Sequence, residues 1–190
     1  MRIQLKNEEF DMRDFLFIVL MIGVFSAIGG FVYETIFYRL AWGYFVKRGT
    51  TFGPWIPIYG AGGIFMTVSI WRFQKNPLAV FLISFFVCGI LEFFVGFVLF
   101  HCFGGLRLWD YNSEPWNFGN IGGYVCLRSV AIFGIFGFLL FYGVIPEILK
   151  IRKRLSEKSF KLISCLLAGI FICDIILHFA VYGLNHTVPR

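Results

Sequence analysis

Residues 15–33 read FLFIVLMIGVFSAIGGFVY, and no side chain in this stretch is charged. An α-helix rises 1.5 Å per residue, so roughly 20 apolar residues cross the hydrocarbon core of a bilayer. Two further uncharged runs cover residues 49–71 and 129–146. Because the apolar residues fall into long runs rather than short ones, the pattern predicts membrane-spanning helices.

The composition points to the same class of protein. The chain of 190 residues is 58% hydrophobic and 15% charged, whereas soluble domains average about 45–50% apolar and 25% charged residues. One small soluble core could not bury this excess of apolar side chains, which is therefore expected to face lipid. A β-barrel is disfavoured because its strands alternate in polarity over about 10 residues. The predicted fold is an all-α polytopic membrane helical bundle.

We predict about five transmembrane helices, at residues 15–38, 55–72, 78–101, 122–145 and 160–182. The chain is expected to form a single integral membrane domain over residues 1–190, with an N-terminal cytoplasmic arm at residues 1–14. That arm mixes acidic and basic residues, and the apolar run after it is longer than the apolar core of a signal peptide. The first helix is therefore expected to be retained.

Basic residues predict the orientation. With five helices, eleven Lys and Arg residues fall on the side of the N-terminus and five fall on the opposite side. Cytoplasmic loops carry the excess of basic residues. The N-terminus is therefore expected in the cytoplasm and the C-terminus outside, in a multi-pass protein of the cell membrane. The net charge of +6 is attributed to loops that meet lipid headgroups, and no nucleic-acid partner is expected.

Two predicted outer loops differ from plain connectors. Residues 43–63 and residues 104–123 are both rich in Gly, Pro, Trp and Tyr. Pro and Gly interrupt helices, and Trp and Tyr favour the membrane interface. Either loop could turn back into the protein as a re-entrant segment, provided that other protein covers its backbone. We also predict that residues 49–63 and 107–121 pack together, with an aromatic lid formed by Trp55, Tyr59, Trp109 and Tyr111.

Four ionisable residues fall inside the predicted helices, namely Glu34, Glu92, Arg128 and Asp174. Helix rise places all four in the outer half of the membrane, on the side of the two loops. Intramembrane charges are rare unless they are paired or functional. Arg128 is therefore expected to lie within salt-bridge or water-bridged reach of at least one of the three acids.

The candidate substrate- or ion-binding residues combine these charges with polar and aromatic neighbours. The full set is Glu34, Glu92, Arg128, Asp174, His178, Trp109, Asp110, Tyr111 and Tyr59. Three interpretations of the charges remain open: a structural lock for the bundle, a polar site for a solute, ion or proton, and an intramembrane catalytic site. The sequence does not choose among them.

Other kinds of chemistry find little support. The five Cys residues show no metal spacing, although a Cys102–Cys126 disulfide is possible. No zinc-protease, serine-hydrolase or nucleotide-binding motif occurs. No metal or cofactor is expected, and no catalytic residue is assigned. If transport is driven by ATP, a separate ATP-binding subunit must bind the nucleotide.

Several blocks of sequence resemble one family of membrane proteins. They are GFVYE at residues 30–34, RG at 48–49, GPWIPIYG at 53–60, LE at 91–92, LWDY at 108–111, PWN at 115–117, Ile121, and CLRS at 126–129. Together they are similar to the putative ABC-transporter type family, also called the CmpB family, and the eukaryotic transmembrane protein 229 family looks related. The resemblance covers roughly residues 25–145, with Asn112 in place of an expected Ser and Phe133 in place of an expected Trp.

The resemblance implies a bacterial polytopic membrane protein of permease-like type, and it implies no substrate and no catalytic residue. The leading hypothesis is a permease or permease-like subunit with an outward-facing polar site, bound to lipid and to a separate ATP-binding subunit or to further copies of itself. The alternatives are a non-transporting structural or regulatory protein that binds partner helices or lipid, and an intramembrane lipid-modifying enzyme.

Overall fold

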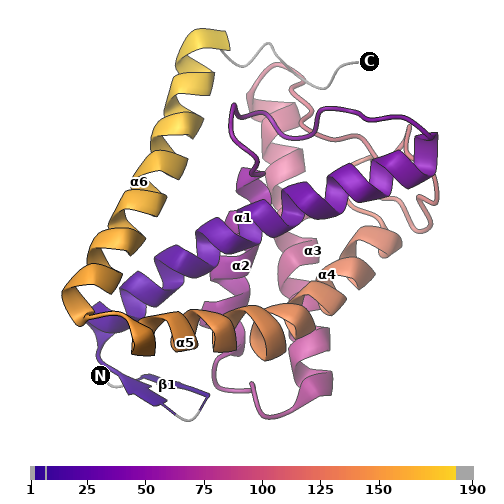
Figure 1. Cartoon of the computed structure of the whole chain (residues 1–190). Coiled ribbons are helices and arrows are strands. Elements are labelled where there is room, and N and C mark those ends of the chain that lie inside the picture. Colours follow the sequence, from indigo (N-terminus) through magenta and orange to yellow (C-terminus); the bar gives the residue numbers. More distant parts are fainter. Residues whose placement is uncertain (1–2, 7, 183–190) are drawn as a thin grey trace.

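The computed structural model describes residues 3–6 and 8–182, and its secondary structure is almost entirely helical. The helices are α1 (Met12–Trp42), α2 (Pro57–Ile70), α3 (Pro77–Cys102), α4 (Leu127–Leu139), the π-helix η1 (Leu140–Val144), α5 (Ile145–Arg154) and α6 (Glu157–Tyr182). A small antiparallel hairpin of β1 (Ile3–Leu5) and β2 (Glu8–Phe10) precedes them. In Figure 1, α1 runs obliquely across the molecule and crosses α2 and α3.

Among the described residues, four helical stretches are long and apolar enough to cross a membrane. They are α1, α3, α6, and the continuous stretch Leu127–Arg154 made of α4, η1 and α5. Helix α2 is also apolar, but its 14 residues extend only about 21 Å, less than the hydrocarbon thickness of about 30 Å. The predicted membrane helical bundle is confirmed, and the prediction of about five helices agrees roughly with the structure.

Residues 43–56, which connect α1 to α2, turn back along α1. Gly43 ends α1 in the left-handed conformation, with φ 77°, which glycine adopts without steric penalty. The chain then returns until the backbone N–H of Ile56 donates to the carbonyl of Ala27, at 3.0 Å. Since Ala27 lies near the middle of α1, this loop folds back into the bundle before α2 begins. It has the path predicted for a re-entrant segment.

Small residues allow α1 and α2 to pack closely. A Cβ atom on Gly30 would lie 2.2 Å from the Tyr59 ring, and one on Gly63 would lie 2.1 Å from the Ser26 hydroxyl. Both glycines are buried. Ser26 and Gly30 therefore lie on the face of α1 that packs against α2. Close packing of this kind is typical of membrane helix interfaces.

The fourth helical stretch differs most from its predicted bounds of 122–145. Helix α4 begins at Leu127, because Gly122 and Gly123 adopt positive φ angles that end any helix there. The stretch then continues beyond residue 145 to Arg154. Pro146 has no N–H, and an α-helix interrupted by proline commonly rearranges its backbone hydrogen bonds. The π-helical turn directly before Pro146 is such a rearrangement.

Within the predicted N-terminal arm of residues 1–14, the described residues 3–6 and 8–14 form the hairpin and the start of α1. The cytoplasmic location of the arm stays a prediction. Helix α1 starts at Met12, with Asp11 accepting a hydrogen bond from the backbone of Asp14 at its N-terminus. Gln74, between α2 and α3, donates to the carbonyl of Gln4 and accepts from the N–H of Lys6. The hairpin therefore covers the connection between α2 and α3.

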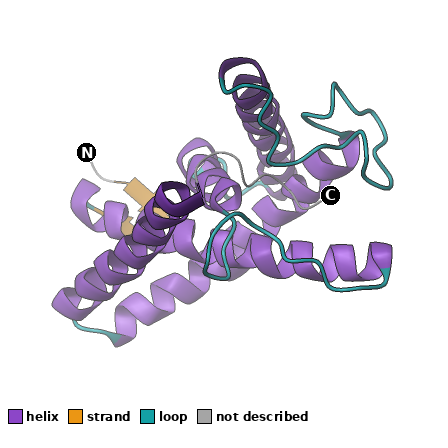
Figure 2. Ribbon diagram, turned by 90° about the horizontal axis from the view of Figure 1, so that it is seen from above, coloured by secondary structure: helices purple, strands orange, loops and turns teal. Residues whose placement is uncertain are grey.

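Ion pairs tie the same end of the molecule together. Asp14 contacts Arg152 at 2.6 Å and Lys161 at 3.0 Å, while Glu8 contacts Lys153 at 3.0 Å. We call this the hairpin end. The connections formed by residues 43–56 and 103–126 lie at the opposite end, called here the loop end, as Figures 1 and 2 show. The prediction that both loops share one side agrees with this arrangement, whereas the termini themselves fall outside the described residues.

Candidate functional site

A cavity of about 530 Å³ lies at the loop end. Its walls come from α1, the start of α2, α3, α4, the last turns of α6, and both loops. The charged and hydroxyl-bearing side chains among its lining residues are Tyr33, Glu34, Tyr38, Lys47, Arg48, Thr50, Tyr59, Glu92, Tyr111, Glu114, Arg128, Ser129 and Tyr182. The cavity is of the size that binds small molecules in other proteins.

The first charged pair joins α1 to the re-entrant loop. The Arg48 Nε lies 2.7 Å from the Glu34 carboxylate, and both side chains are largely removed from solvent, with exposed fractions of 10% and 16%. The Arg48 guanidinium also lies over the Tyr38 ring, 3.8 Å from its centroid. The pair is one reason why the loop stays folded against α1, because a buried charge is stable only when it is paired.

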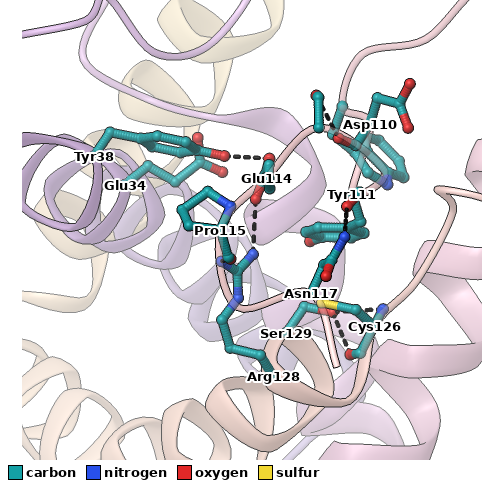
Figure 3. A network of polar contacts seen from close by, with 12 residues as sticks. Glu34, Tyr38, Asp110, Tyr111, Glu114, Pro115, Asn117, Cys126, Arg128 and Ser129 are labelled. Carbon is teal, nitrogen blue, oxygen red and sulfur yellow. Dashed lines mark hydrogen bonds and ion pairs between the residues drawn. The ribbon is translucent and has the colours of Figure 1, made fainter. Parts of the chain in front are cut away.

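The second charged pair joins α4 to residues 103–126, called here the second loop, as Figure 3 shows. Arg128 donates to the Glu114 carboxylate and to the carbonyl of Pro115, each at 2.7 Å. The other carboxylate oxygen of Glu114 accepts a hydrogen bond from the Tyr38 hydroxyl. Tyr38 thus contacts both pairs, since its ring faces Arg48 and its hydroxyl bonds Glu114.

Arg128 was predicted to lie within salt-bridge or water-bridged reach of Glu34, Glu92 or Asp174. The salt-bridge part of this prediction is wrong, because the ion-pair partner of Arg128 among the described residues is Glu114. Glu34 pairs with Arg48, Glu92 accepts from hydroxyl groups, and Asp174 holds a loop. The physical reason is the direction of helical side chains, which point toward the N-terminus of their helix. Arg128 lies in the first turn of α4, so its side chain extends toward the preceding loop, where Glu114 lies.

Glu92 lies on the face of α3 that looks into the cavity and is 6% exposed. Tyr111 donates to its Oε1 at 2.5 Å, and the Ser129 Oγ lies 2.8 Å from its Oε2. The Ser129 Oγ is equally close to the carbonyl of Cys126, and its single proton serves one acceptor at a time. Burial raises the pKa of the Tyr111 phenol, so Tyr111 keeps the proton that it donates.

Glycines lie on the face of α3 on both sides of Glu92. A Cβ atom on Gly89 would lie 2.7 Å from Val130, and one on Gly96 would lie 3.2 Å from the rings of Trp109 and Tyr124. Because these glycines have no side chain, α4 and the second loop approach α3 closely. Ser129 and Tyr111 are thereby brought within hydrogen-bond distance of Glu92.

Asp174 holds the re-entrant loop from α6. Its carboxylate accepts hydrogen bonds from the backbone N–H of Phe52 at 3.1 Å and of Gly53 at 2.8 Å, and from the Trp55 indole at 2.5 Å. Asp174 itself does not line the cavity, whereas His178, one turn further along α6, does. We call the Asp174 contacts the loop clasp. The clasp attaches α6 to the wall of the cavity.

The loop clasp predicts a measurable role for Asp174. Replacing Asp174 with Asn keeps the size of the side chain but removes the charge that three donors share, and hydrogen bonds to charged groups contribute about 1.5–3 kcal/mol each. Unfolding in detergent is expected to begin at a lower temperature, and Trp55 fluorescence should shift as its indole is released. Trp55→Phe, which removes one of the three donors, should have a smaller effect on stability. Equal effects of the two variants would contradict the clasp.

Seven of the nine candidate residues line the cavity, namely Glu34, Glu92, Arg128, His178, Trp109, Tyr111 and Tyr59. Asp174 forms the loop clasp. Asp110 accepts from Arg107 at 3.2 Å and from the Asn112 side chain at 2.7 Å, so it orders its own loop. The structure therefore brings together residues from α1, α2, α3, α4, α6 and the second loop.

The predicted aromatic lid is not formed. The Trp55 ring packs against Phe171 of α6, and the Trp109 indole donates to the carbonyl of Tyr124. Tyr111 points to Glu92, and Tyr59 faces α1 from the first turn of α2. The two loops do line one cavity, but these four side chains have separate partners and do not pack together as a lid.

Sequence reasoning missed Tyr38, Lys47, Arg48, Glu114 and Ser129, all of which line the cavity. Arg48 and Glu114 lie in loops, where a charged side chain usually faces water and does not indicate a binding site. One feature of the sequence could have indicated both residues. Each lies in a Gly- and Pro-rich loop that was itself predicted to turn back toward the protein.

Comparison with known proteins agrees with the sequence blocks described above. The model of the family described as Putative ABC-transporter type IV matches residues 20–179. The match extends beyond the predicted limits of 25–145 and includes most of α6. No curated protein and no solved structure matches the chain, and a relation to the transmembrane protein 229 family stays a prediction. With a match over most of its length and helices suited to a membrane, the chain belongs to the putative ABC-transporter type IV family.

Proposed function

We propose that this protein is a permease or permease-like subunit, and that its cavity is an outward-facing site for a solute. The observation that supports the proposal is the cavity of about 530 Å³, which five helices and two loops line. Three of these helices, α1, α3 and α4, and both loops contribute charged side chains to it. Ionisable groups within membrane helices are costly and typically mark a substrate or ion pathway. A purely structural pair would need no cavity of this size beside it.

The broken path of the chain supports the same proposal. Transporters commonly bind substrate where a helix is interrupted within the membrane, because the interruption exposes backbone groups and a helix end. Residues 43–56 fold back along α1, and the first residues of α2, Pro57 and Ile58, line the cavity. The cavity therefore lies at the interruption.

The proposed subunit works as a single integral membrane domain of the cell membrane, in contact with lipid. Because the sequence has no nucleotide-binding motif, transport driven by ATP requires a separate ATP-binding subunit, and the family suggests such an association. The subunit would dock on the cytoplasmic face, which we assign to the hairpin end because that end carries the excess of basic residues. Homo-oligomers are an alternative assembly.

The proposal is tested by uptake into proteoliposomes. The chain, purified together with any ATP-binding subunit that accompanies it, is tested for ATP-dependent uptake of labelled amines, amino acids, sugars and carboxylates. We expect uptake of at least one class, lost in Glu92→Gln and retained in Glu147→Gln. Glu147 is the matched control because it is 65% exposed and lies at the hairpin end, paired with Lys150.

Two other results would replace the proposal. Stable protein partners without uptake of any class would favour the structural or regulatory function. Turnover of a lipid by the purified chain would favour the intramembrane enzyme.

The proposed orientation predicts the reactivity of Cys102. The sequence allowed a Cys102–Cys126 disulfide, but in the structure both thiols are free, with Cys102 exposed and Cys126 buried. Cys102 ends α3 at the loop end. In intact cells, a variant with Cys102 as its one cysteine should react with a membrane-impermeant maleimide. A variant with one cysteine at exposed Lys75, at the hairpin end, should react only after the cells are opened. The reverse result would invert the topology.

A further inference from the structure

Two of the three acidic side chains that line the cavity are paired with an arginine, and the third is not. Arg48 is matched by Glu34, and Arg128 is matched by Glu114, both at 2.7 Å. Glu92 is the third acid. Among the described residues, no Lys or Arg nitrogen lies within ion-pair distance of it, and its direct partners are hydroxyl groups. Ionised Glu92 therefore leaves one negative charge in the wall without a cation beside it.

The Glu92 carboxylate also has room for another donor. An ionised carboxylate offers about four acceptor positions, and Tyr111 and Ser129 occupy at most two of them. Since the Ser129 proton is shared between Glu92 and the carbonyl of Cys126, the second position is filled only part of the time. Because Glu92 lines the cavity, a ligand in the cavity can donate hydrogen bonds to its remaining lone pairs.

Other cations nearby do not supply the missing charge. Lys47 also lines the cavity, but it is exposed at the loop end, where water screens it. The Arg128 guanidinium lies 5.5 Å from the centre of the Tyr111 ring, yet its donors are directed to Glu114 and Pro115. Each positively charged side chain at the cavity is therefore either paired with an acid other than Glu92 or solvated by water.

Aromatic rings form the wall across several helices. The Tyr59 ring lies 6.4 Å from that of Tyr33 and 5.6 Å from that of Phe133, so α1, α2 and α4 each contribute one ring. All three rings line the cavity. The face of an aromatic ring attracts a cation, and recognition of ammonium groups by aromatic side chains uses this attraction. The same rings offer apolar surface to the body of a ligand.

We propose that the cavity binds a monovalent organic cation. Its ammonium group contacts Glu92, and its apolar body lies against the rings of Tyr33, Tyr59 and Phe133. An anionic ligand would meet the Glu92 carboxylate, and a strongly polar one would leave the rings without a partner. The proposal rests on the cavity being a binding site, as in the proposed function, and it names the chemical class of the ligand.

The test compares three probes of nearly equal shape and different charge: 2-phenylethylamine, which is cationic at neutral pH, neutral 2-phenylethanol, and anionic phenylacetate. Binding to the full chain in lipid nanodiscs is measured by calorimetry. We expect 2-phenylethylamine to bind at least about tenfold more tightly than either analogue, which is about 1.4 kcal/mol. Tighter binding of phenylacetate, equal binding of all three, or no binding of the amine at about 10 mM would overturn the proposal.

Variants assign the preference to Glu92. Glu92→Gln should reduce the affinity for the amine about tenfold and leave the affinity for 2-phenylethanol unchanged, so the neutral probe reports whether the cavity is still folded. Glu92→Asp should retain the preference for the amine, and Glu147→Gln should behave as wild type. An unchanged preference in Glu92→Gln would refute the assignment. Amine binding without uptake would refute the transport function alone, whereas uptake of anions would refute the ligand class alone.

Discussion

Replacing Glu114 with Gln is expected to destabilise the protein by about 3 kcal/mol, within the range of about 3–5 kcal/mol for breaking a buried ion pair. The change leaves the Arg128 guanidinium without a carboxylate, and the single carbonyl oxygen of Gln replaces the two oxygens that accept from Arg128 and from the Tyr38 hydroxyl. The side chains of Arg128 and Glu114 are only 13% and 8% exposed. We expect the lower end of the range, because water in the cavity can solvate part of the charge. Unfolding in one fixed detergent measures the effect.

Two controls separate pairing from a general effect of mutation. Glu147→Gln breaks a pair in which both side chains are more than 60% exposed, and surface pairs contribute about 0–1 kcal/mol. Likewise, Arg128→Ala should lower stability more than Arg107→Ala, since Arg107 is more exposed. If Glu114→Gln and Glu147→Gln unfold alike, the Glu114 pair is not buried in the membrane-embedded protein.

A double variant tests the pairing directly. Combining Glu114→Gln with Arg128→Met removes both charges, and an apolar replacement of a whole buried pair is often tolerated. The double variant is therefore expected to be more stable than Glu114→Gln alone. Additive losses would indicate that the two residues act independently.

Replacing Gly30 with Ala is the second change with a large expected effect. The new Cβ would lie 2.2 Å from the Tyr59 Cγ and 2.6 Å from the Tyr59 Cβ. The Tyr59 Cβ cannot rotate away as the tip of a flexible side chain would, so α1 and α2 must separate. Overpacking of this kind costs about 1–3 kcal/mol. Because Tyr59 is also part of the cavity wall, the variant should bind 2-phenylethylamine more weakly as well.

The adjacent glycine is a matched control. Apart from the adjoining residues and backbone of α1 itself, no atom lies within 4 Å of a Cβ placed on Gly29, and Ala is a better helix former than Gly by about 0.8–1.0 kcal/mol. Gly29→Ala should therefore unfold at the same temperature as the wild type or slightly above it. Similar destabilisation by both changes would show that helix α1 tolerates no alanine here, and the close contact with α2 would not be the cause.

The re-entrant loop shows where prediction from local pattern reaches its limit. Gly and Pro in residues 43–63 indicated an interrupted helix, and the interruption is present. The pattern did not reveal that the loop runs back to Ala27, or that α2 is left with 14 residues. Hydropathy measures the length of an apolar run. The start of α2 depends instead on a contact between distant segments, the hydrogen bond from the Ile56 N–H to the carbonyl of Ala27 in α1.

The sequence by itself determined that this chain forms a bundle of membrane helices, because the length of an apolar run is a local property. It also predicted that Glu34, Glu92, Arg128 and Asp174 lie in the same half of the bundle, and the first three line one cavity. Only the tertiary structure decided their partners, since Arg48 reaches Glu34, Glu114 reaches Arg128 and Tyr111 reaches Glu92 from loops. The path of a loop depends on backbone angles at glycines and on contacts between distant segments, and spacing along a helix does not encode them.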